Sequence, residues 1–191
     1  AKNEAQHFEV VRCREGLPGI LPEIVKHLGV KRLGFESVRL SYSHFQRIHG
    51  HLKEQVPDVT LVPSKGLIED LRIKKDPQEI KTITEALAVA ESVFRQSLGG
   101  LSTRKTERQI AWEIEKAMRE SGAEAMAFPP IVASGPNAAM PHAVPSDRPL
   151  SGGEPLLFDW GCRMNGYCSD ISRTVCIGPK DDTFRKVFNT V

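Results

Sequence analysis

Two aspartates in the segment 155–178 are spaced so that both carboxylates could reach one centre. Asn165-Gly166 in this segment is the strongest short signal for a β-hairpin turn. If these residues form a two-residue turn, Asp159 and Asp170 fall on the same face of the hairpin, because side chains alternate between the two faces of a strand. As a diagonal cross-strand pair their backbones stand roughly 7–8 Å apart.

Two carboxylates directed at one point repel each other unless positive charge lies between them. A shared proton, a basic side chain or metal ions could supply that charge. The hairpin pattern also predicts that Asp159 lies opposite Ser172 and Met164 opposite Tyr167. A four-residue loop centred on Asn165-Gly166 would keep the two aspartates on one face, and a three-residue loop would not. The alternative interpretation is that both aspartates are ordinary polar residues on a solvated sheet face.

His142 is a further candidate for chemistry. It lies within Met140-Pro141-His142-Ala143, in a loop rich in Pro, Gly and Ser. A histidine held on a stiff loop could move protons or donate a hydrogen bond to an oxyanion. The alternative is a solvated loop histidine without a function.

Composition and charge narrow the class of protein. The 191 residues are 40% hydrophobic and 26% charged, as in a soluble globular protein. The net charge of +2 gives no reason to expect nucleic acid or an anionic membrane as partner. No apolar run approaches the roughly 20 residues that span a bilayer. The four cysteines lack a CxxC metal pair, and we interpret them as reduced thiols of a cytoplasmic protein.

The first third of the chain alternates strand and helix signals. Strands are expected at 7–13, 30–36 and 58–64, and helices at 21–29 and 41–55, with an apolar stripe in the first helix that ends at Leu28. This order predicts an α/β layer with a partly parallel sheet. Residues 64–76 have mixed charge and are expected to form an exposed connector.

The rest of the chain predicts two helices followed by strands. The first helix opens at Asp76 with Pro and Glu in its first turn, and the second opens at Thr106 with Gln109 three residues later; both are capping patterns. The expected apolar stripe of the first is Ile80, Ile83, Leu87, Ala90, Phe94 and Leu98, and that of the second is Ile110, Ile114, Ala117 and Met118. Together with a strand at 131–134 and the hairpin, these helices predict an α+β unit.

Three stretches then carry a resemblance to a known family. FPPIVASGPNAAMPHA, LLFDWGC and GYCSDISRTVCIG resemble the pita-bread (M24-type) metallopeptidases, in the branch of Xaa-Pro aminopeptidases and Xaa-Pro dipeptidases (prolidases). LIEDLRIKKDPQEIKTITEALAVAESVF is similar to that branch's linker and first catalytic-domain helix. The resemblance implies an α+β fold: part of a smaller, creatinase-type α/β N-terminal domain over 1–66, and the first half of a pita-bread domain over 67–191.

The resemblance also implies a site. Asp159 matches the first metal-ligand aspartate, Asp170 the aspartate that bridges two divalent ions, and His142 the histidine that contacts the substrate. The ions implied are Mn²⁺, with Co²⁺ or Zn²⁺ as alternatives. The activity implied is removal of the N-terminal residue from peptides with proline in second position, by attack of a metal-bridging hydroxide, in a homodimer.

The chain departs from the family pattern at its end. The family's remaining ligands, a histidine and two glutamates, follow the SDISRT motif, and no such residues are found before Val191. We therefore expect this chain to be a piece of a longer protein and inactive alone. Three alternatives stay open: a non-catalytic pita-bread module that binds peptides or proteins, a metal-free creatinase, and a scaffold without a site. Dipeptidase and longer-peptide aminopeptidase are not distinguished.

Overall fold

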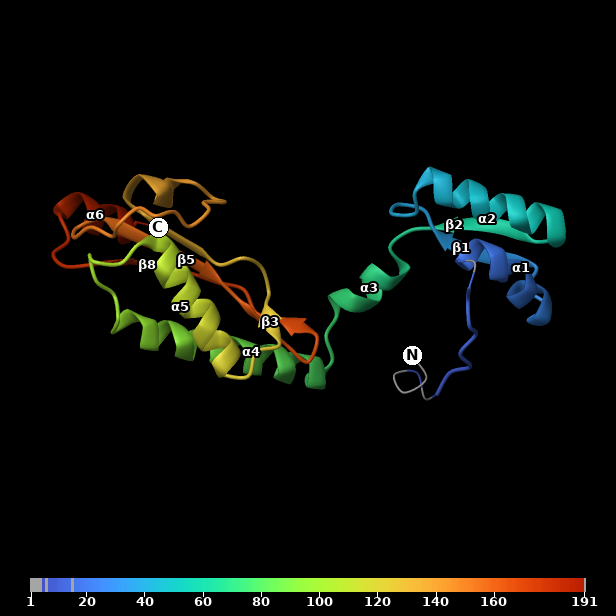
Figure 1. The fold of residues 1–191 in the computed structure, drawn as a ribbon, viewed down its shortest axis with the longest axis horizontal. Helices are drawn as coiled ribbons and strands as arrows, with labels where there is room; N and C mark the ends of the chain where they lie inside the picture. The colour runs from blue at the N-terminus through green and yellow to red at the C-terminus, as the bar shows by residue number, and fades with distance from the viewer. Residues whose placement is uncertain (1–4, 6, 15, 191) are drawn as a thin grey trace. The chain divides into compact units, whose positions relative to one another are not determined.

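The computed structural model describes residues 5, 7–14 and 16–190, and the chain divides into two compact units, Ala1–Lys74 and Lys75–Val191 (Figure 1). The expected boundary at 66/67 falls at the start of α3 (Leu67–Ile73), a helix in which no residue is buried. The segment 64–76 is largely exposed, as expected of a connector, while the boundary itself stays a prediction.

The first unit is a small α/β layer. Its elements are α1 (Leu17–His27), β1 (Arg32–Glu36), α2 (Tyr42–Gln55) and β2 (Thr60–Ser64). β1 and β2 pair in parallel, and the helices contact each other around a core of Val25, Ile48 and Leu52. The predicted α/β order and parallel pairing are therefore confirmed for these four elements.

Two expectations for this unit are wrong. Residues 7–13 form no strand, and Phe8 within them is 78% exposed. The apolar pattern of this segment is the basis for predicting a strand. A strand also needs a neighbouring strand, because otherwise its backbone N–H and C=O groups stay unpaired. Leu28 is exposed as well, because it caps α1 and lies beyond the last helical turn.

In the second unit, two long helices pack on two antiparallel sheets. Its elements are α4 (Pro77–Leu98), α5 (Glu107–Glu120), β3 (Ala125–Met126), β4 (Ile131–Ser134), the 3₁₀ helix η1 (Gly135–Ala139), β5 (Pro155–Trp160), β6 (Cys162–Met164), β7 (Tyr167–Cys168), β8 (Ile171–Cys176) and α6 (Asp182–Phe188). The strand orders are β3-β6-β7 and β4-β5-β8. α4 and α5 contact each other and the strands, and Figure 1 shows them together on one side of the strands.

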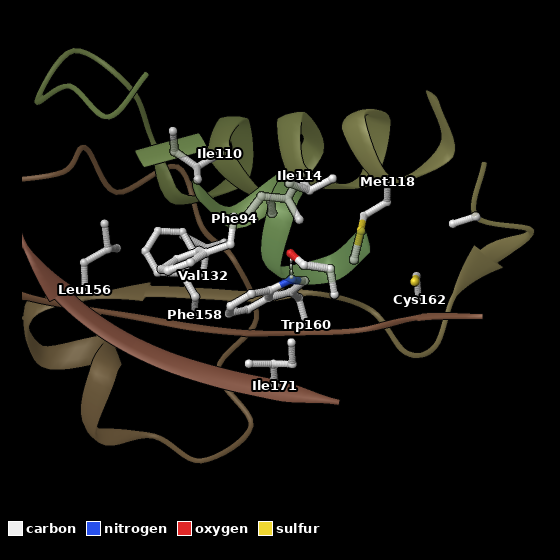
Figure 2. Close-up of a cluster of buried hydrophobic side chains, with 14 of the residues drawn as sticks. Phe94, Ile110, Ile114, Met118, Val132, Leu156, Phe158, Trp160, Cys162 and Ile171 are labelled. Carbon is white, nitrogen blue, oxygen red and sulfur yellow. Dashed lines mark hydrogen bonds between the residues drawn. The ribbon is translucent and has the colours of Figure 1, made fainter. Parts of the chain in front are cut away.

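Three aromatic rings dominate the core between helices and sheet (Figure 2). Phe94 of α4 stacks on Trp160 of β5 with ring centroids 4.6 Å apart, and meets Phe158 edge-on at 5.2 Å. The indole Nε1 of Trp160 donates a hydrogen bond of 3.1 Å to the Ala90 carbonyl. Trp160 thus joins β5, the strand that carries Asp159, to α4.

The predicted stripe of α4 is partly wrong. Ala90 and Phe94 are buried as expected, but Ile80, Leu87 and Leu98 are exposed. The residues buried on this helix are Thr82, Ala86, Ala90, Val93 and Phe94. The two alanines let β5 and β6 approach the helix closely enough for Trp160 and Cys162 to bond its carbonyls. The stripe of α5 is confirmed at Ile110, Ile114 and Met118, with Ala117 half-buried.

The expected hairpin is present with its expected register. Asn165 has φ 48° and Gly166 φ 79°, the left-handed pair that a two-residue type I′ turn requires. Met164 pairs with Tyr167, and Asp159 pairs with Ser172. The hairpin contributes β6 and β7 to one sheet and β5 and β8 to the other, so the turn fixes the register of both.

Candidate metal centre

Asp159 lies on the face of β5 that points away from the core. Its neighbours Phe158 and Trp160 are both buried among the core side chains. Because adjacent side chains of a strand point to opposite faces, the Asp159 carboxylate projects from the other face, where it is half-buried. Asp159 is thus held in place by two of the largest side chains of the core.

Asp170 lies on the same outer face, directly before β8. It is exposed, while Ser169 and Ile171 on either side are buried. Ile171 pairs with Trp160, so the inward sides of the two strands match, and so do their outward sides. The same-face arrangement expected from the turn is present; the role of both aspartates as metal ligands stays a prediction.

The Asp159 carboxylate is oriented by a neighbouring strand. Ser172 Oγ donates a hydrogen bond of 2.9 Å to Asp159 Oδ1. Ser172 also lines a cavity of about 670 Å³, together with Pro155 and Thr174 of the sheet and Phe184 and Phe188 of α6. The residue that orients Asp159 therefore lies at a concave surface, the kind of surface in which small ligands bind.

The donor chemistry of this face suits hard divalent cations, since carboxylate oxygens are preferred by Mg²⁺ and Mn²⁺ and are also accepted by Zn²⁺. Within the described ranges no group of three or more His, Cys, Asp and Glu side chains is close enough to hold a metal ion. The oxygen donors of Asp159 and Asp170 are of the type that a divalent metal binds. Among the described residues they form only part of a ligand set.

His142 is exposed on a turn that follows η1. Its loop leaves the sheet at Ser134, the last residue of β4, which pairs with Leu156, whereas Ile131 of the same strand pairs with Asp159. Ser134, where the loop starts, is thus three residues along β4 from the residue opposite Asp159. At the rise per residue of a strand, this offset is roughly 10 Å. In the part of the chain that the structure describes, no hydrogen bond joins His142 to either aspartate.

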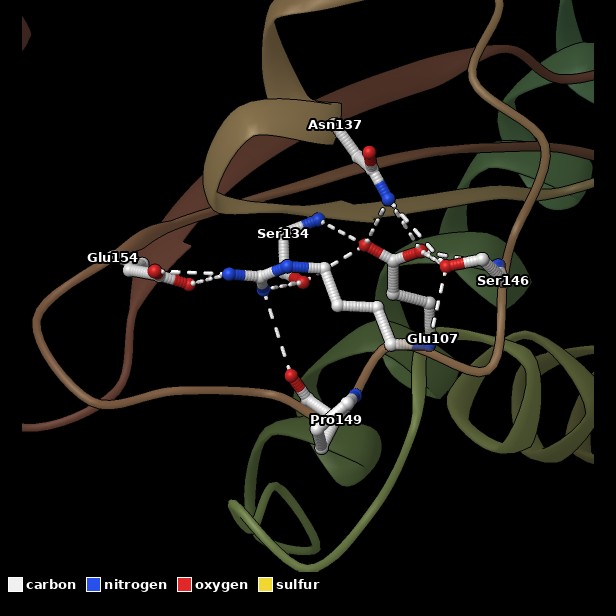
Figure 3. A network of polar contacts seen from close by, with 7 residues as sticks. Glu107, Ser134, Asn137, Ser146, Pro149 and Glu154 are labelled. Carbon is white, nitrogen blue, oxygen red and sulfur yellow. Dashed lines mark hydrogen bonds and ion pairs between the residues drawn. The ribbon is translucent and has the colours of Figure 1, made fainter.

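A buried carboxylate that the sequence analysis missed lies beneath this loop. Glu107, in the first turn of α5, is 0% exposed. Figure 3 shows it at the centre of a polar network. Its Oε1 accepts from the Ser134 N–H at 2.7 Å and the Ser134 hydroxyl at 2.8 Å, its Oε2 accepts from the Ser146 N–H at 3.0 Å and the Ser146 hydroxyl at 2.6 Å, and Asn137 Nδ2 bonds both oxygens at 3.1 Å.

The network sets the protonation state of Glu107. Burial by itself would raise the pKa of this carboxyl, but the hydrogen bonds from Ser146 and Ser134 outweigh it, and the pKa lies below its ordinary value. Arg148 extends the network by donating to Ser134 Oγ at 2.6 Å and to both oxygens of Glu154. Glu107 is therefore an anion inside the fold.

Little in the sequence pointed to Glu107. An acidic residue directly after the capping Thr106 is common at solvent-exposed helix starts, where it complements the helix dipole. The available signal was the position of Ile110, because Glu107 lies one turn before it and so on the buried stripe. A carboxylate on that stripe requires donors, and the Ser- and Asn-containing loop supplies them.

Comparison with known protein families shows the class to which this chain belongs. The chain belongs to metallopeptidase family M24: the model of that family matches residues 81–191, and the creatinase/prolidase N-terminal domain matches residues 1–74. The resemblance inferred from the motifs and the α+β fold class are thereby confirmed. The family implies divalent metal ions.

Two sequence relatives illustrate the match. The chain is 34% identical over 191 residues to the uncharacterized peptidase YqhT of Bacillus subtilis, covering 100% of this chain and 53% of that protein. It is 34% identical over 169 residues to an Xaa-Pro dipeptidase of Pyrococcus furiosus, covering 88% and 47%. The relatives thus include the Xaa-Pro peptidase branch expected from the sequence.

Solved structures agree with this assignment. An Xaa-Pro dipeptidase from Bacillus anthracis superposes with a TM-score of 0.90 at 34% identity, covering 100% of this chain and 52% of that one. An X-Pro aminopeptidase from Thermotoga maritima gives 0.86 at 33% identity, covering 97% and 52%. The chain spans about half the length of the relatives it matches.

Every helix formed by the described residues is too short or too polar to cross a membrane.

Proposed function

We propose that the complete protein is a metal-dependent exopeptidase that removes the N-terminal residue from peptides with proline in second position. The observation that carries this proposal is the position of Asp159 and Asp170 on one outer face of the hairpin, in a chain of family M24. The names of the relatives, Xaa-Pro dipeptidase and X-Pro aminopeptidase, support the substrate class.

In this proposal Asp159 and Asp170 hold two divalent ions, Mn²⁺ in the first instance, with Co²⁺ or Zn²⁺ as alternatives. Such ions, when bound, lower the pKa of a bound water and polarise the substrate carbonyl. The Ser172 hydroxyl orients the Asp159 carboxylate, so that little reorganisation of this ligand is needed when a cation binds.

His142 has a separate role in the proposed reaction. Its imidazole N–H would donate a hydrogen bond to the carbonyl oxygen of the cleaved bond as negative charge develops there. Its exposed position on a turn leaves the ring accessible to a peptide. Because His142 is not one of the proposed metal ligands, replacement of His142 should reduce turnover and leave metal binding intact.

The resemblance implies three further ligands, a histidine and two glutamates, and we propose that they lie beyond Val191 in the complete protein. The present chain alone would then bind metal weakly and be inactive. We also propose a cytoplasmic homodimer; the support for the compartment is that all four cysteines, Cys13, Cys162, Cys168 and Cys176, are free thiols, as is usual in reducing compartments.

Release of the first residue from an Xaa-Pro dipeptide and an Xaa-Pro tripeptide by the complete protein tests the proposal. Turnover is expected with Mn²⁺, Co²⁺ or Zn²⁺ and should be lost after chelation. Cleavage of the dipeptide alone assigns a dipeptidase, and cleavage of both assigns an aminopeptidase. Absence of turnover with all three metals contradicts the proposal, and peptide binding without turnover would then indicate the non-catalytic binding module.

A further inference from the structure

The loop that carries His142 begins and ends on one carboxylate. Residues 135–145 run from Ser134 to Ser146, and both serines donate their N–H and their hydroxyl to Glu107. Oε1 accepts the two hydrogen bonds from the start of the loop, and Oε2 accepts the two from its end. Glu107 thus closes the loop at its base (Figure 3).

The closure is charge-assisted and shielded from water. Five donor groups converge on Glu107: two from Ser134, two from Ser146 and one from Asn137. Hydrogen bonds to an ionised group are about twice as strong as neutral ones, and each donor left unpaired in a buried site carries a desolvation penalty. Two backbone bonds add to the closure, from the Glu107 N–H to the Arg148 carbonyl and from the Arg108 N–H to the Ser146 carbonyl.

The placement of His142 depends on the loop that carries it. The His142 side chain is exposed, whereas the next residue, Ala143, is buried and donates its N–H to the Met140 carbonyl at 3.3 Å. The ring is therefore placed by the backbone around it, and that backbone is held at both ends by Glu107. A shift of the loop ends would move the imidazole without altering its chemistry.

We propose that Glu107 is a positioning residue for His142, acting by fixing both ends of the 135–145 loop. The inference rests on the proposed peptidase function for its consequence in turnover. Its structural part, closure of the loop by a buried anion, holds independently of that function.

The test is a double-mutant cycle in the complete protein, with Glu107→Gln made in the native background and in the His142→Ala background. In the native background the introduced amide would place two N–H donors in a site whose other groups are already donors. We expect kcat to fall ~10-fold or more, with a smaller change in KM. This loss is a part of the roughly 10²–10⁴-fold that a positioned acid–base group contributes. In the His142→Ala background the same substitution should change kcat less than ~2-fold, because the group that it positions is gone. Glu107→Asp, which keeps the charge, should recover part of the loss.

Ile114→Val is the matched control, because Ile114 is buried on the same helix and belongs to the hydrophobic core. It should have the same effect on kcat in both backgrounds. If Glu107→Gln does not fold, Ser146→Ala, which removes one donor at the loop end, carries the same cycle. Equal loss of kcat in both backgrounds would overturn the proposal and leave Glu107 as a structural residue only.

A second readout separates this proposal from the proposed function. Amide hydrogen exchange of the segment 135–145 should be at least ~10-fold faster in Glu107→Gln than in Ile114→Val, because loss of the closure allows local opening. If the native protein shows no turnover, the peptidase function fails and the exchange result alone decides the loop closure. Unchanged exchange contradicts the closure, whatever the activity.

Discussion

Asp159 and Ser172 face each other across the β5–β8 ladder, and the serine hydroxyl donates a hydrogen bond of 2.9 Å to Asp159 Oδ1. The pairing follows from the two-residue turn at Asn165-Gly166, six positions away on each strand. A local turn signal thus determines which side chain orients a candidate metal ligand. This relationship leads to the first two predictions.

Replacing either aspartate should abolish turnover. In the complete protein, Asp159→Asn and Asp170→Asn each remove a negative oxygen ligand, and we expect Mn²⁺ affinity and peptide release to fall below detection. Asp58→Asn, at an exposed aspartate of the first unit, is the control and should leave both unchanged. Calorimetric titration with Mn²⁺ measures the affinity, and retained affinity in both variants would contradict the assignment of ligands.

Ser172→Ala should have a smaller effect of the same kind. The variant keeps Asp159 and loses only the hydrogen bond that orients it, and loss of such an outer partner typically costs 10–100-fold in metal affinity or activity. Ser151→Ala, in an exposed loop, serves as control. An effect of Ser172→Ala as large as that of Asp159→Asn would show that the serine is itself a ligand.

Trp160 should be the most important aromatic residue for stability. Trp160→Ala removes a buried ring that stacks on Phe94 and bonds Ala90, and we expect the free energy of unfolding to fall by ~3–5 kcal/mol. Trp112→Ala, at a side chain that is 62% exposed, should change it by less than ~0.5 kcal/mol. Urea unfolding followed by circular dichroism checks both values.

The hairpin turn should tolerate alanine poorly. Gly166 has φ 79°, where a side chain costs roughly 1–2 kcal/mol, so Gly166→Ala should destabilise the protein by about that amount. Gly50 provides the opposite case, because it lies inside α2 and a Cβ there would meet no atom within 4 Å. Gly50→Ala should therefore stabilise by ~0.5–1 kcal/mol. Equal effects of the two substitutions in urea unfolding would contradict the turn geometry.

The free energy of unfolding should depend on pH through the ionisation of Glu107. Its pKa is lowered in the folded protein from an ordinary value of 4.5, through hydrogen bonds from Ser146 and Ser134 that outweigh burial. The unfolded chain therefore takes up this proton first, so the stabilisation is fully present above 4.5 and is lost as the pH falls through the lower, folded pKa. Compared with Glu107→Gln, the native protein should be more stable at neutral pH, and the difference should narrow as the pH drops below 4.5. A constant difference in urea unfolding would show that Glu107 does not titrate as described.

The features that could be predicted from the sequence are those with local causes. Both capping boxes, at Asp76 and Thr106, are formed, because a cap involves residues three apart in the chain. The hairpin register followed from two residues that favour left-handed backbone. These are the elements that place Asp159 and Asp170, which is why this part of the candidate site could be located in advance.

The features that could not be predicted depend on distant partners. The buried face of α4 is set by how closely Trp160 approaches Ala90, and periodicity alone favoured the larger side chains of Ile80 and Leu87. Glu107 was missed because its donors come from residues 27–39 positions away. Segment 7–13 has an apolar pattern typical of a strand, but a strand also requires a neighbour that no local pattern supplies.

A crystal structure of the complete protein grown with Zn²⁺ would show whether Asp159 and Asp170 bind metal. Anomalous difference density locates the metal without reference to activity. We expect two peaks on the outer face of the hairpin, within ~2.0–2.2 Å of carboxylate oxygens of Asp159 and Asp170, with Asp170 contacting both. Peaks elsewhere, or carboxylates that point away from each other with no density between them, would contradict it.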